Sequence, residues 1–468
     1  MKKSLVISHN SHVVDNSNGE TYSRIVRYFI PEYIISLVIY SMPFFIDSYF
    51  IGQLESTSSY AALGSMNNLL HFLIKIAEAF SIGTVIVAGN HNGKRDFKEV
   101  GRAARDSLWM MLVLGFVFSI GLFFGAQTLC EWYRLSDELI AHAVPFLRLR
   151  AVGVFFTFAS LALIGFLRGI KNSKAPMKIF MFGALVFLFF DYTLIFGNFG
   201  FPRLGLLGSA YASVIQYATI FVIALGYVLF NEKYRKYAID LFKVFKDKSH
   251  AKKLIKVSWP IILDKATMAG AYIWLGRVIS PLGTNCVASF CVIKDMERFA
   301  FLPAIACAQV ITFLVSNDFS IANWNGIRSN IKKVIFLSAG MVLFVLIFFS
   351  MYAEPVATIF DKKGDFAPLA ARAFPIISVL VVFDLLQLIL SGALRGAGNV
   401  KTVMIVRLIV CLGYFVPVSH FLSRLPIRDE MLKVMLVYGA FYIGNGIMSV
   451  VYIWRLRGDH WNKTSAKD

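Results

Sequence analysis

About twelve apolar runs divide this chain, and each approaches the roughly 20 residues that a helix needs to cross a lipid bilayer. Hydrophobic residues make up 57% of the chain and charged residues only 16%, whereas soluble domains average about 25% charged residues. We therefore predict an all-α integral membrane protein. The expected crossings are residues 28–51, 58–90, 107–129, 143–167, 177–199, 205–230, 255–279, 286–316, 333–353, 373–394, 402–423 and 431–454.

The basic residues are concentrated in short loops between these runs, and they predict an orientation. The formal net charge is +19, but the Lys and Arg form no soluble basic face, so we do not expect nucleic acid as a partner. Roughly 31 of them lie on one side and about 9 on the other, which assigns the richer side to the cytoplasm. We expect a multi-pass protein of the bacterial cytoplasmic (inner) membrane with both termini in the cytosol.

The distribution of polar segments predicts two bundles. The first residues are polar and lack the apolar stretch of a signal peptide. The five cysteines show neither metal-ligand spacing nor a disulfide framework. The predicted organisation is a cytosolic tail (1–27), a six-helix bundle (28–230), a basic cytosolic linker (231–254), a second six-helix bundle (255–454) and a cytosolic tail (455–468).

A repeated motif indicates that the two bundles arose by duplication. The pattern G-x-L-R-G-x-x-N-x-K occurs at Gly165–Lys174 and again at Gly392–Lys401, 227 residues later. Six crossings per half make the repeats enter the membrane in the same direction, so they are related by an axis along the membrane normal. We interpret the motif as a turn at the cytosolic membrane edge, where the arginine snorkels to lipid headgroups and glycine permits a tight turn.

Ionisable residues inside predicted crossings are candidate functional groups, because burying them is costly. Asp47 and Asp191 lie at the outer ends of the first and fifth crossings and should reach similar depth. If they face the same interior, they favour sharing one proton, as a proton-coupled transporter requires. The alternative for Asp47 is a structural hydrogen bond to Ser48 or Ser41.

The second half carries Asp384 and Asp264 near mid-bilayer, in the tenth and seventh crossings. Lys265 either pairs with Asp264 or snorkels toward the cytosol. In the second crossing, Lys75 and Glu78 share a helix face and are expected to form an ion pair, with a substrate contact as the alternative. The segment KDMER at residues 294–298 is expected to pair within itself in the same way.

Four segments carry a resemblance to a known family. They are FFIDSYFIGQLES, GFLRGIKNSKAPM, FDYTLIFGNFGFPRLGLLGSAYAS and FDLLQLILSGALRGAGNVKT, in this order along the chain. In them the chain resembles the multidrug and toxic compound extrusion (MATE) family, part of the multidrug/oligosaccharidyl-lipid/polysaccharide flippase superfamily. The resemblance implies two six-helix bundles in a V around a central cavity, and export of organic cations and other amphipathic compounds in exchange for protons or sodium.

The same resemblance assigns coupling residues. Asp47 and Asp191 stand where the family has aspartates in helices 1 and 5, and Asp384 matches a helix-10 aspartate of one branch. That branch also has a helix-7 glutamate, but Asp264 lies closer to Pro260 than the glutamate does to its proline, so this transfer is weaker. The chain has Phe187 where the family often has an Asn, and Ser213 replaces a common Thr; losing an amide oxygen favours protons over sodium.

From these observations we expect a secondary antiporter that exports amphipathic, often cationic, small molecules by alternating access. No cofactor other than the coupling ion, H+ or Na+, is expected, and no enzyme motif is present. The other expected partners are membrane lipids, and the protein is expected to be a monomer. The alternatives are a lipid-linked oligosaccharide flippase of the same superfamily and a non-transporting scaffold. Candidate cavity residues are Tyr40, Met42, Phe45, Phe187 and Glu78, and candidate helix-bending residues are Pro31 and Pro43.

Overall fold

The apolar runs fold as α-helices, and the described part of the chain contains no β-strand. The computed structural model describes residues 19–40, 42–53, 57–132, 137–240, 249–282, 284–358 and 367–457. A helix satisfies its backbone hydrogen bonds internally, which explains why uncharged runs of this length take this form in a bilayer.

The N-terminal half makes six crossings, the first of which consists of two helices in sequence. The helices are α1 (Tyr22–Tyr40), α2 (Met42–Gly52), α3 (Thr57–Gly93), α4 (Phe97–Trp132), α5 (Asp137–Gly169), α6 (Lys174–Phe196) and α7 (Leu206–Phe230). A short 3-10 turn, η2 (Asn198–Gly200), precedes α7, and another, η3 (Glu232–Tyr237), follows it.

The C-terminal half also makes six crossings. Its fifth crossing is interrupted by a π-helical segment, η5 (Val410–Phe415), between two α-helical parts. The elements are α8 (Ser249–Ile279), η4 (Ser280–Leu282), α9 (Thr284–Phe319), α10 (Trp324–Met351), α11 (Ala353–Thr358), α12 (Ala367–Gly396), α13 (Val400–Ile409), η5, α14 (Val416–Ser423) and α15 (Glu430–Arg457).

Ten described helices or helix pairs are long and apolar enough to span a membrane. The remaining two crossings are α1–α2 and α8, which contain more charge: α1 carries Arg24, Arg27 and Glu32, and α8 starts with several lysines. The predicted all-α membrane fold with twelve crossings is confirmed. Some helices are longer than the apolar runs from which they were predicted. Helix α4, for example, begins at Phe97, whereas the apolar run was expected from residue 107.

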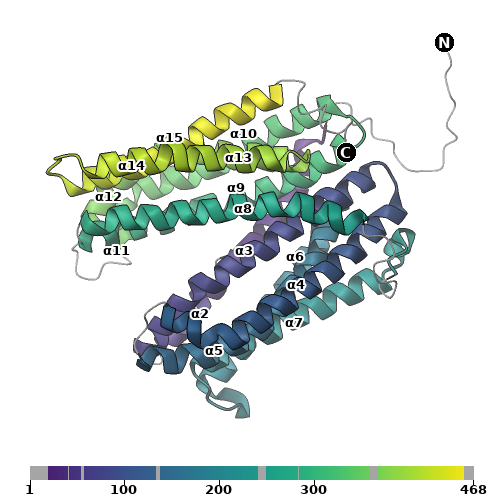
Figure 1. The fold of residues 1–468 in the computed structure, drawn as a ribbon, viewed down its shortest axis with the longest axis horizontal. Coiled ribbons are helices and arrows are strands. Elements are labelled where there is room, and N and C mark those ends of the chain that lie inside the picture. The colour runs from purple at the N-terminus through teal and green to yellow at the C-terminus, as the bar shows by residue number, and fades with distance from the viewer. Residues whose placement is uncertain are drawn as a thin grey trace.

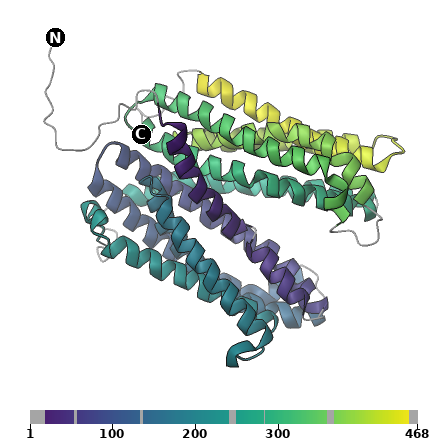
Figure 2. The same ribbon diagram turned by 180° about the vertical axis from the view of Figure 1, so that it is seen from behind.

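The two halves form separate bundles that meet at one end and diverge at the other, in a V (Figure 1). The N-terminal bundle has its own core around Phe146, Phe158 and Phe166. Helix α1 joins the bundles: Ile25 and Phe29, near its start, pack in a core of the C-terminal bundle, whereas its later residues pack in the N-terminal bundle (Figure 2). We call the end where the bundles meet the closed end.

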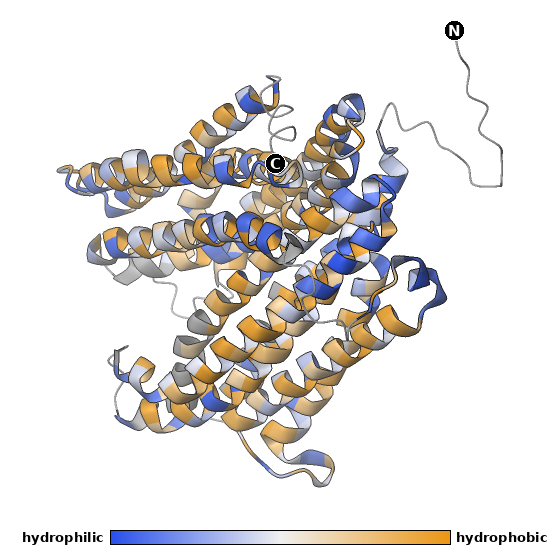
Figure 3. Cartoon of the chain, turned by 45° about the vertical axis from the view of Figure 1, so that its right-hand side comes forward, coloured by the Kyte–Doolittle hydropathy of each residue, from blue (hydrophilic) through white to orange (hydrophobic). Residues whose placement is uncertain are grey.

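Large apolar side chains cover the outward faces of the peripheral helices. On α10, Phe336, Phe344 and Phe348 are exposed at helical spacing, and α4 exposes Phe116 and Phe124. Figure 3 shows hydrophobic residues along the helices and hydrophilic ones gathered at the closed end and in the turns. Such a surface suits lipid rather than water, so the chain is an integral multi-pass membrane protein.

The glycines of the repeated motif have a packing role that differs from the expected one. A Cβ on Gly165 of α5 would lie 2.8 Å from the Ser81 carbonyl of α3, and one on Gly392 of α12 would lie 2.9 Å from the Ala308 carbonyl of α9. Ser81 and Ala308 are themselves 227 residues apart. Small residues let helices approach closely in membranes. Gly165 and Gly392 therefore form a helix–helix seam and do not make the turn; the glycine that does so, as expected, is Gly398 of the second half.

The turn itself is a Schellman-type cap in both halves. The backbone N–H of Asn172 donates to the Leu167 carbonyl at 2.9 Å, and the backbone N–H of Lys171 donates to the Arg168 carbonyl at 2.9 Å. In the second half, Gly398 takes the place of Lys171, and both residues have a left-handed φ, of 78° and 61°. The predicted turn is thus present, but it depends on the residue at this cap position.

Candidate functional site

The arginines of the repeated motif point into the protein and form buried ion pairs. Arg168 donates from Nε and Nη2 to the two carboxylate oxygens of Glu32 on α1, at 3.0 and 2.7 Å. Glu32 is fully buried, and Arg168 is 8% exposed. Pro31, which precedes Glu32, lies inside α1. The interpretation that Arg168 snorkels to lipid was wrong, because the buried carboxylate offers it two charge-assisted hydrogen bonds.

The corresponding arginine of the second half, Arg395, bonds to Asp264 on α8. Arg407 on α13 donates to the other oxygen of the same carboxylate and also to the Met268 sulfur, at 2.9 Å. Asp264 is therefore held between two guanidinium groups, and Lys265 is not its partner. Such a carboxylate is compensated structurally, so nothing in this geometry favours the coupling role expected for Asp264.

Asp47 and Asp191 lie together in the interior of the N-terminal bundle. Ser209 on α7 donates to Asp47 Oδ1 at 2.5 Å, and both aspartates are at most 4% exposed. Neither carboxylate oxygen of Asp191 has a hydrogen-bond partner among the described residues. The two aspartates interact electrostatically with one another and with Arg150. The structure therefore brings together the pair that the depth argument selected.

Sequence reasoning missed Ser209 and selected Ser213, one helical turn later on the same face of α7. Ser213 is also buried, but Ser209 makes the bond to Asp47. Phe187 is 1% exposed, one turn before Asp191, and Met42 packs against the same bundle core. These positions lie inside the bundle, which does not support Phe187 as a lining residue of the space between the bundles. The side chains of Tyr40, Pro43 and Phe45 lie outside the described residues.

The C-terminal bundle contains two further carboxylates, of which Glu297 is buried and Asp384 is partly buried. Glu297 on α9 accepts hydrogen bonds from Tyr438 and, at 2.7 Å, from Tyr442 of α15. Asp384 on α12 accepts one from the Asn445 amide at 3.0 Å. Glu297 is therefore not paired within KDMER as expected, although Arg298 and Asp295 of that segment are, at 3.6 Å. The sequence feature that could have predicted these bonds is the helical spacing of polar residues on α15.

Lys75, Glu78 and Lys265 form an ion cluster between the bundles. The Glu78 carboxylate accepts from Lys75 at 3.2 Å, as expected, and from Lys265 of α8 at 3.0 Å. The cluster borders a cavity of about 180 Å³ between α3 and α8. The cavity is lined by Phe72, Lys75, Ile76, Ile262, Lys265, Ala266 and Ala269.

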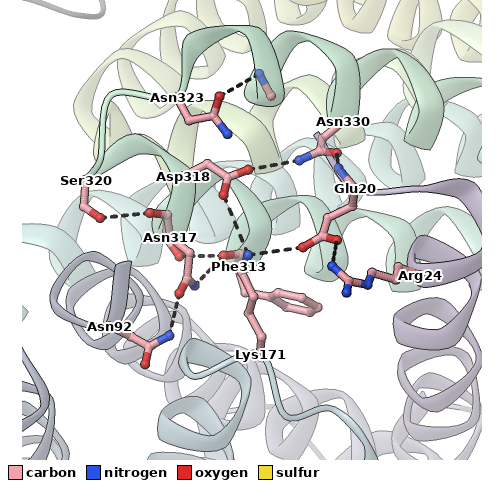
Figure 4. A network of polar contacts seen from close by, with 12 residues as sticks. Glu20, Arg24, Asn92, Lys171, Phe313, Asn317, Asp318, Ser320, Asn323 and Asn330 are labelled. Atoms are coloured by element: carbon pink, nitrogen blue, oxygen red, sulfur yellow. Dashed lines mark hydrogen bonds and ion pairs between the residues drawn. The ribbon is translucent and has the colours of Figure 1, made fainter. Parts of the chain in front are cut away.

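A polar network joins the bundles at the closed end (Figure 4). Lys171 of the N-terminal bundle lies 3.5 Å from Glu20 and 3.7 Å from Asp318 of α9. The Asn317 amide of α9 donates to the Gly169 carbonyl at 2.9 Å. Asn92, at the end of α3, donates to Asn317 at 2.7 Å. These contacts hold the ends of α3, α5 and α9 together and close the V at this end.

The fold and these sites define a two-bundle membrane protein with buried carboxylates, the architecture of a secondary transporter. The MatE family profile matches residues 33–193 and again 260–419, two segments separated by the offset of the repeated motif. The chain belongs to the MatE family.

Relatives and solved structures agree with this assignment. The chain is 24% identical over 389 residues to the probable multidrug resistance protein NorM of Thermotoga maritima, covering 83% of this chain and 81% of the relative. It is 23% identical over 428 residues to the probable multidrug resistance protein YoeA of Bacillus subtilis, covering 90% of each. The outward-facing conformation of a multidrug resistance MATE family transporter of the MOP superfamily matches with a TM-score of 0.86 at 21% identity, covering 96% of this chain and 98% of that one.

Proposed function

We propose that the protein is a secondary antiporter that exports amphipathic small molecules in exchange for protons. The observation that carries the proposal is the Asp47–Asp191 pair, two carboxylates buried in one apolar interior, for which Ser209, bonded to Asp47, is the one hydrogen-bond donor among the described residues. A carboxylate without compensating donors is stabilised by taking up a proton. The names of the relatives, which are multidrug resistance proteins, support a broad substrate range.

The surroundings of this pair favour a proton over sodium as the coupling ion. Hard cations such as sodium require several oxygen ligands, as the oxygen-rich sites of other hard cations illustrate. Phe187 occupies the position one turn before Asp191, and it brings no oxygen to the site. A proton needs only one carboxylate oxygen. Asp384, bonded to Asn445, is a further coupling candidate in the other bundle.

The closed end supports an alternating-access mechanism. The polar network around Lys171 and Asp318 seals one end, while the bundles diverge at the other (Figure 1). We assign the closed end to the cytoplasm of a bacterial cell, because basic residues such as Lys94, Arg95 and Lys98 lie there, and both termini follow. The structure then corresponds to an outward-facing state of a monomer, and rocking of the bundles would expose the cavity to the cytosol.

The test uses purified protein in liposomes with an acidic lumen and a pH-sensitive dye. A panel of organic cations and acidic amphiphiles is added with and without sodium, and proton efflux in exchange for substrate should collapse the gradient. Asp47→Asn should abolish the response, whereas Asp137→Asn, at an exposed position at the start of α5, should leave it unchanged. Full activity of Asp47→Asn would remove the central role of Asp47.

Two other outcomes would redirect the proposal. Exchange that appears only with an imposed sodium gradient would overturn the choice of proton and retain antiport. Silence with every substrate and both gradients would overturn antiport and favour the lipid-linked oligosaccharide flippase.

A further inference from the structure

The cavity between the bundles presents positive charge. Lys75 lies near the middle of the 37-residue α3, and Lys265 near the middle of the 31-residue α8, so the cavity is at about mid-depth. Each bundle contributes one ammonium group to its wall. Among the described residues that line it, none is a carboxylate.

The carboxylate that neutralises these lysines is withdrawn from the cavity. Lys75 and Lys265 both contact the same oxygen of Glu78, and the side chain of Glu78 is only 8% exposed. The lysine side chains are 39% and 22% exposed. Two cations therefore share this anion, and Glu78 is not among the residues that line the cavity. The three side chains of the cluster together carry a formal charge of +1.

The next charged residues do not reverse this sign. Arg298 of α9 interacts electrostatically with Lys75, so it belongs to the same region, and it pairs with Asp295 at 3.6 Å. That pair is neutral as a unit. The aspartates of the proposed coupling site are buried inside the N-terminal bundle and do not line the cavity.

The other described residues of the cavity wall are apolar. They are Phe72, which is 43% exposed, and Ile76, Ile262, Ala266 and Ala269. A ligand that fits both parts has a hydrophobic body and an acidic group. A carboxylate or phosphate would gain charge-assisted hydrogen bonds from the two lysines, whereas an organic cation would be repelled by them.

We infer that this cavity binds the acidic group of an amphipathic substrate, a carboxylate or a phosphate, through Lys75 and Lys265. The inference rests on the proposed transport function and specifies its substrate class. It departs from the expected preference for organic cations. The acidic group belongs either to a free amphiphile or to the headgroup of an anionic lipid.

The test compares two fluorescent probes that differ in one group. Rhodamine 110 carries a free carboxylate, and rhodamine 123 is its methyl ester. Binding to the purified protein in phosphatidylcholine nanodiscs is measured by fluorescence polarisation at equal ionic strength. We expect rhodamine 110 to bind about tenfold more tightly, the effect of one charge-assisted hydrogen bond. Equal affinities, or tighter binding of the ester, would overturn the inference.

Variants assign the preference to the cluster. In Lys75→Gln/Lys265→Gln the preference should fall to less than about twofold, while rhodamine 123, which the lysines repel, should bind at least as tightly as to the wild type. Because these changes leave Glu78 buried without its lysines, the triple variant with Glu78→Gln is measured as well, and the same loss is expected. Lys253→Gln, exposed on the same helix α8, should keep the preference. Retention of the preference in both cluster variants would overturn the inference.

Two further arms separate the sources and the dependence on transport. Phosphatidylglycerol added to the nanodiscs should weaken rhodamine 110 binding if a lipid headgroup occupies the cavity; unchanged binding would assign the site to free amphiphiles. Asp47→Asn should keep the binding preference, because binding requires no gradient. If liposome exchange fails but the preference remains and depends on the lysines, the antiport proposal is wrong and the anion site stands.

Discussion

The two halves of the molecule share their packing but differ in how they neutralise buried charge. In the N-terminal bundle, Arg168 donates two hydrogen bonds to Glu32. In the C-terminal bundle, Arg395 shares Asp264 with Arg407. At the repeat offset of 227 residues, the position of Arg407 corresponds to Phe180, a buried residue of the first core. The motif arginine was thus kept, and its partner was rebuilt in each half.

The carboxylates diverged further than the arginines. The position of Asp47 corresponds to Trp274 in the second half, and that of Asp384 corresponds to Thr157 in the first. Glu297 corresponds to Leu70. Glycine contacts that fix the helix packing were preserved at the same offset. The difference teaches that duplication preserved the scaffold, while each bundle acquired its own ionisable groups.

The largest effect is expected from Asp264→Asn, which leaves two buried arginines without their carboxylate. Breaking a buried ion pair from one side costs about 3–5 kcal/mol. Glu32→Gln exposes only one arginine and should cost less. The measurement is the thermal midpoint and the monodisperse yield of detergent-purified protein. As a control, replacing the whole pair with Glu32→Leu/Arg168→Met should be milder than Glu32→Gln. Equal stability of Asp264→Asn and wild type would contradict the expectation that the C-terminal bundle depends more strongly on its buried carboxylate than the N-terminal bundle does.

The next largest effect is expected from adding a methyl group to the glycines of the helix–helix seam. A Cβ on Gly396 would lie 2.5 Å from the Thr312 carbonyl, and one on Gly169 would lie 2.9 Å from the Ala88 Cβ. We expect Gly396→Ala to cost about 1–3 kcal/mol and Gly169→Ala somewhat less, because a carbonyl yields less easily than a methyl group. Gly340→Ala on α10, where no atom lies within 4 Å of the added Cβ, is the control. It should be neutral or slightly stabilising in the same thermal assay.

A smaller effect on stability, but a clear one on transport, is expected from Ser209→Ala. It removes the hydroxyl bonded to Asp47, a hydrogen bond with a net contribution to stability of about 1 kcal/mol. We expect substrate–proton exchange in liposomes to slow several-fold with little change in folding. Ser213→Ala is the matched control and should exchange normally. The reverse ranking of the two serines would favour the residue selected from sequence.

The smallest effect is expected from Lys171→Gly, which makes the first cap equivalent to the second. Glycine adopts the left-handed conformation without strain, a gain of roughly 1 kcal/mol. The change also removes the contacts of Lys171 with Glu20 and Asp318, part of the closed-end network. The two effects should nearly cancel in thermal stability. A loss of several degrees in the thermal midpoint would show that these contacts outweigh the backbone strain.

The fold could be predicted in large part from sequence, because it depends on the length of apolar runs and on a local repeat. The caps at Asn172 and Asn399 are local features of the same kind. Partners of buried charges could not be predicted in this way. The distance along the chain between Arg168 and Glu32 is long, and helical periodicity gives no information about which helices become neighbours.

The proximity of the proposed coupling residues, Asp47 and Asp191, was predicted from depth, and the residues around them were not. Asp47 and Asp191 could be matched because each lies a few residues before a glycine at a helix end. Ser209 could not be distinguished from Ser213, because both lie on the same face of α7. Glu297 was missed because Lys294 and Arg298 offered it local partners on its own helix, which its bonds to α15 replaced.

The repeat of structural features at a fixed offset indicates how the chain evolved. Each half carries its own cap, its own glycine seam and its own arginine pair, so a single half would lack only a surface on which to close. Two parallel copies related by a two-fold axis could supply that surface to each other. The present chain can then be understood as a fused homodimer, in which covalent linkage freed the two subunits to evolve different charges.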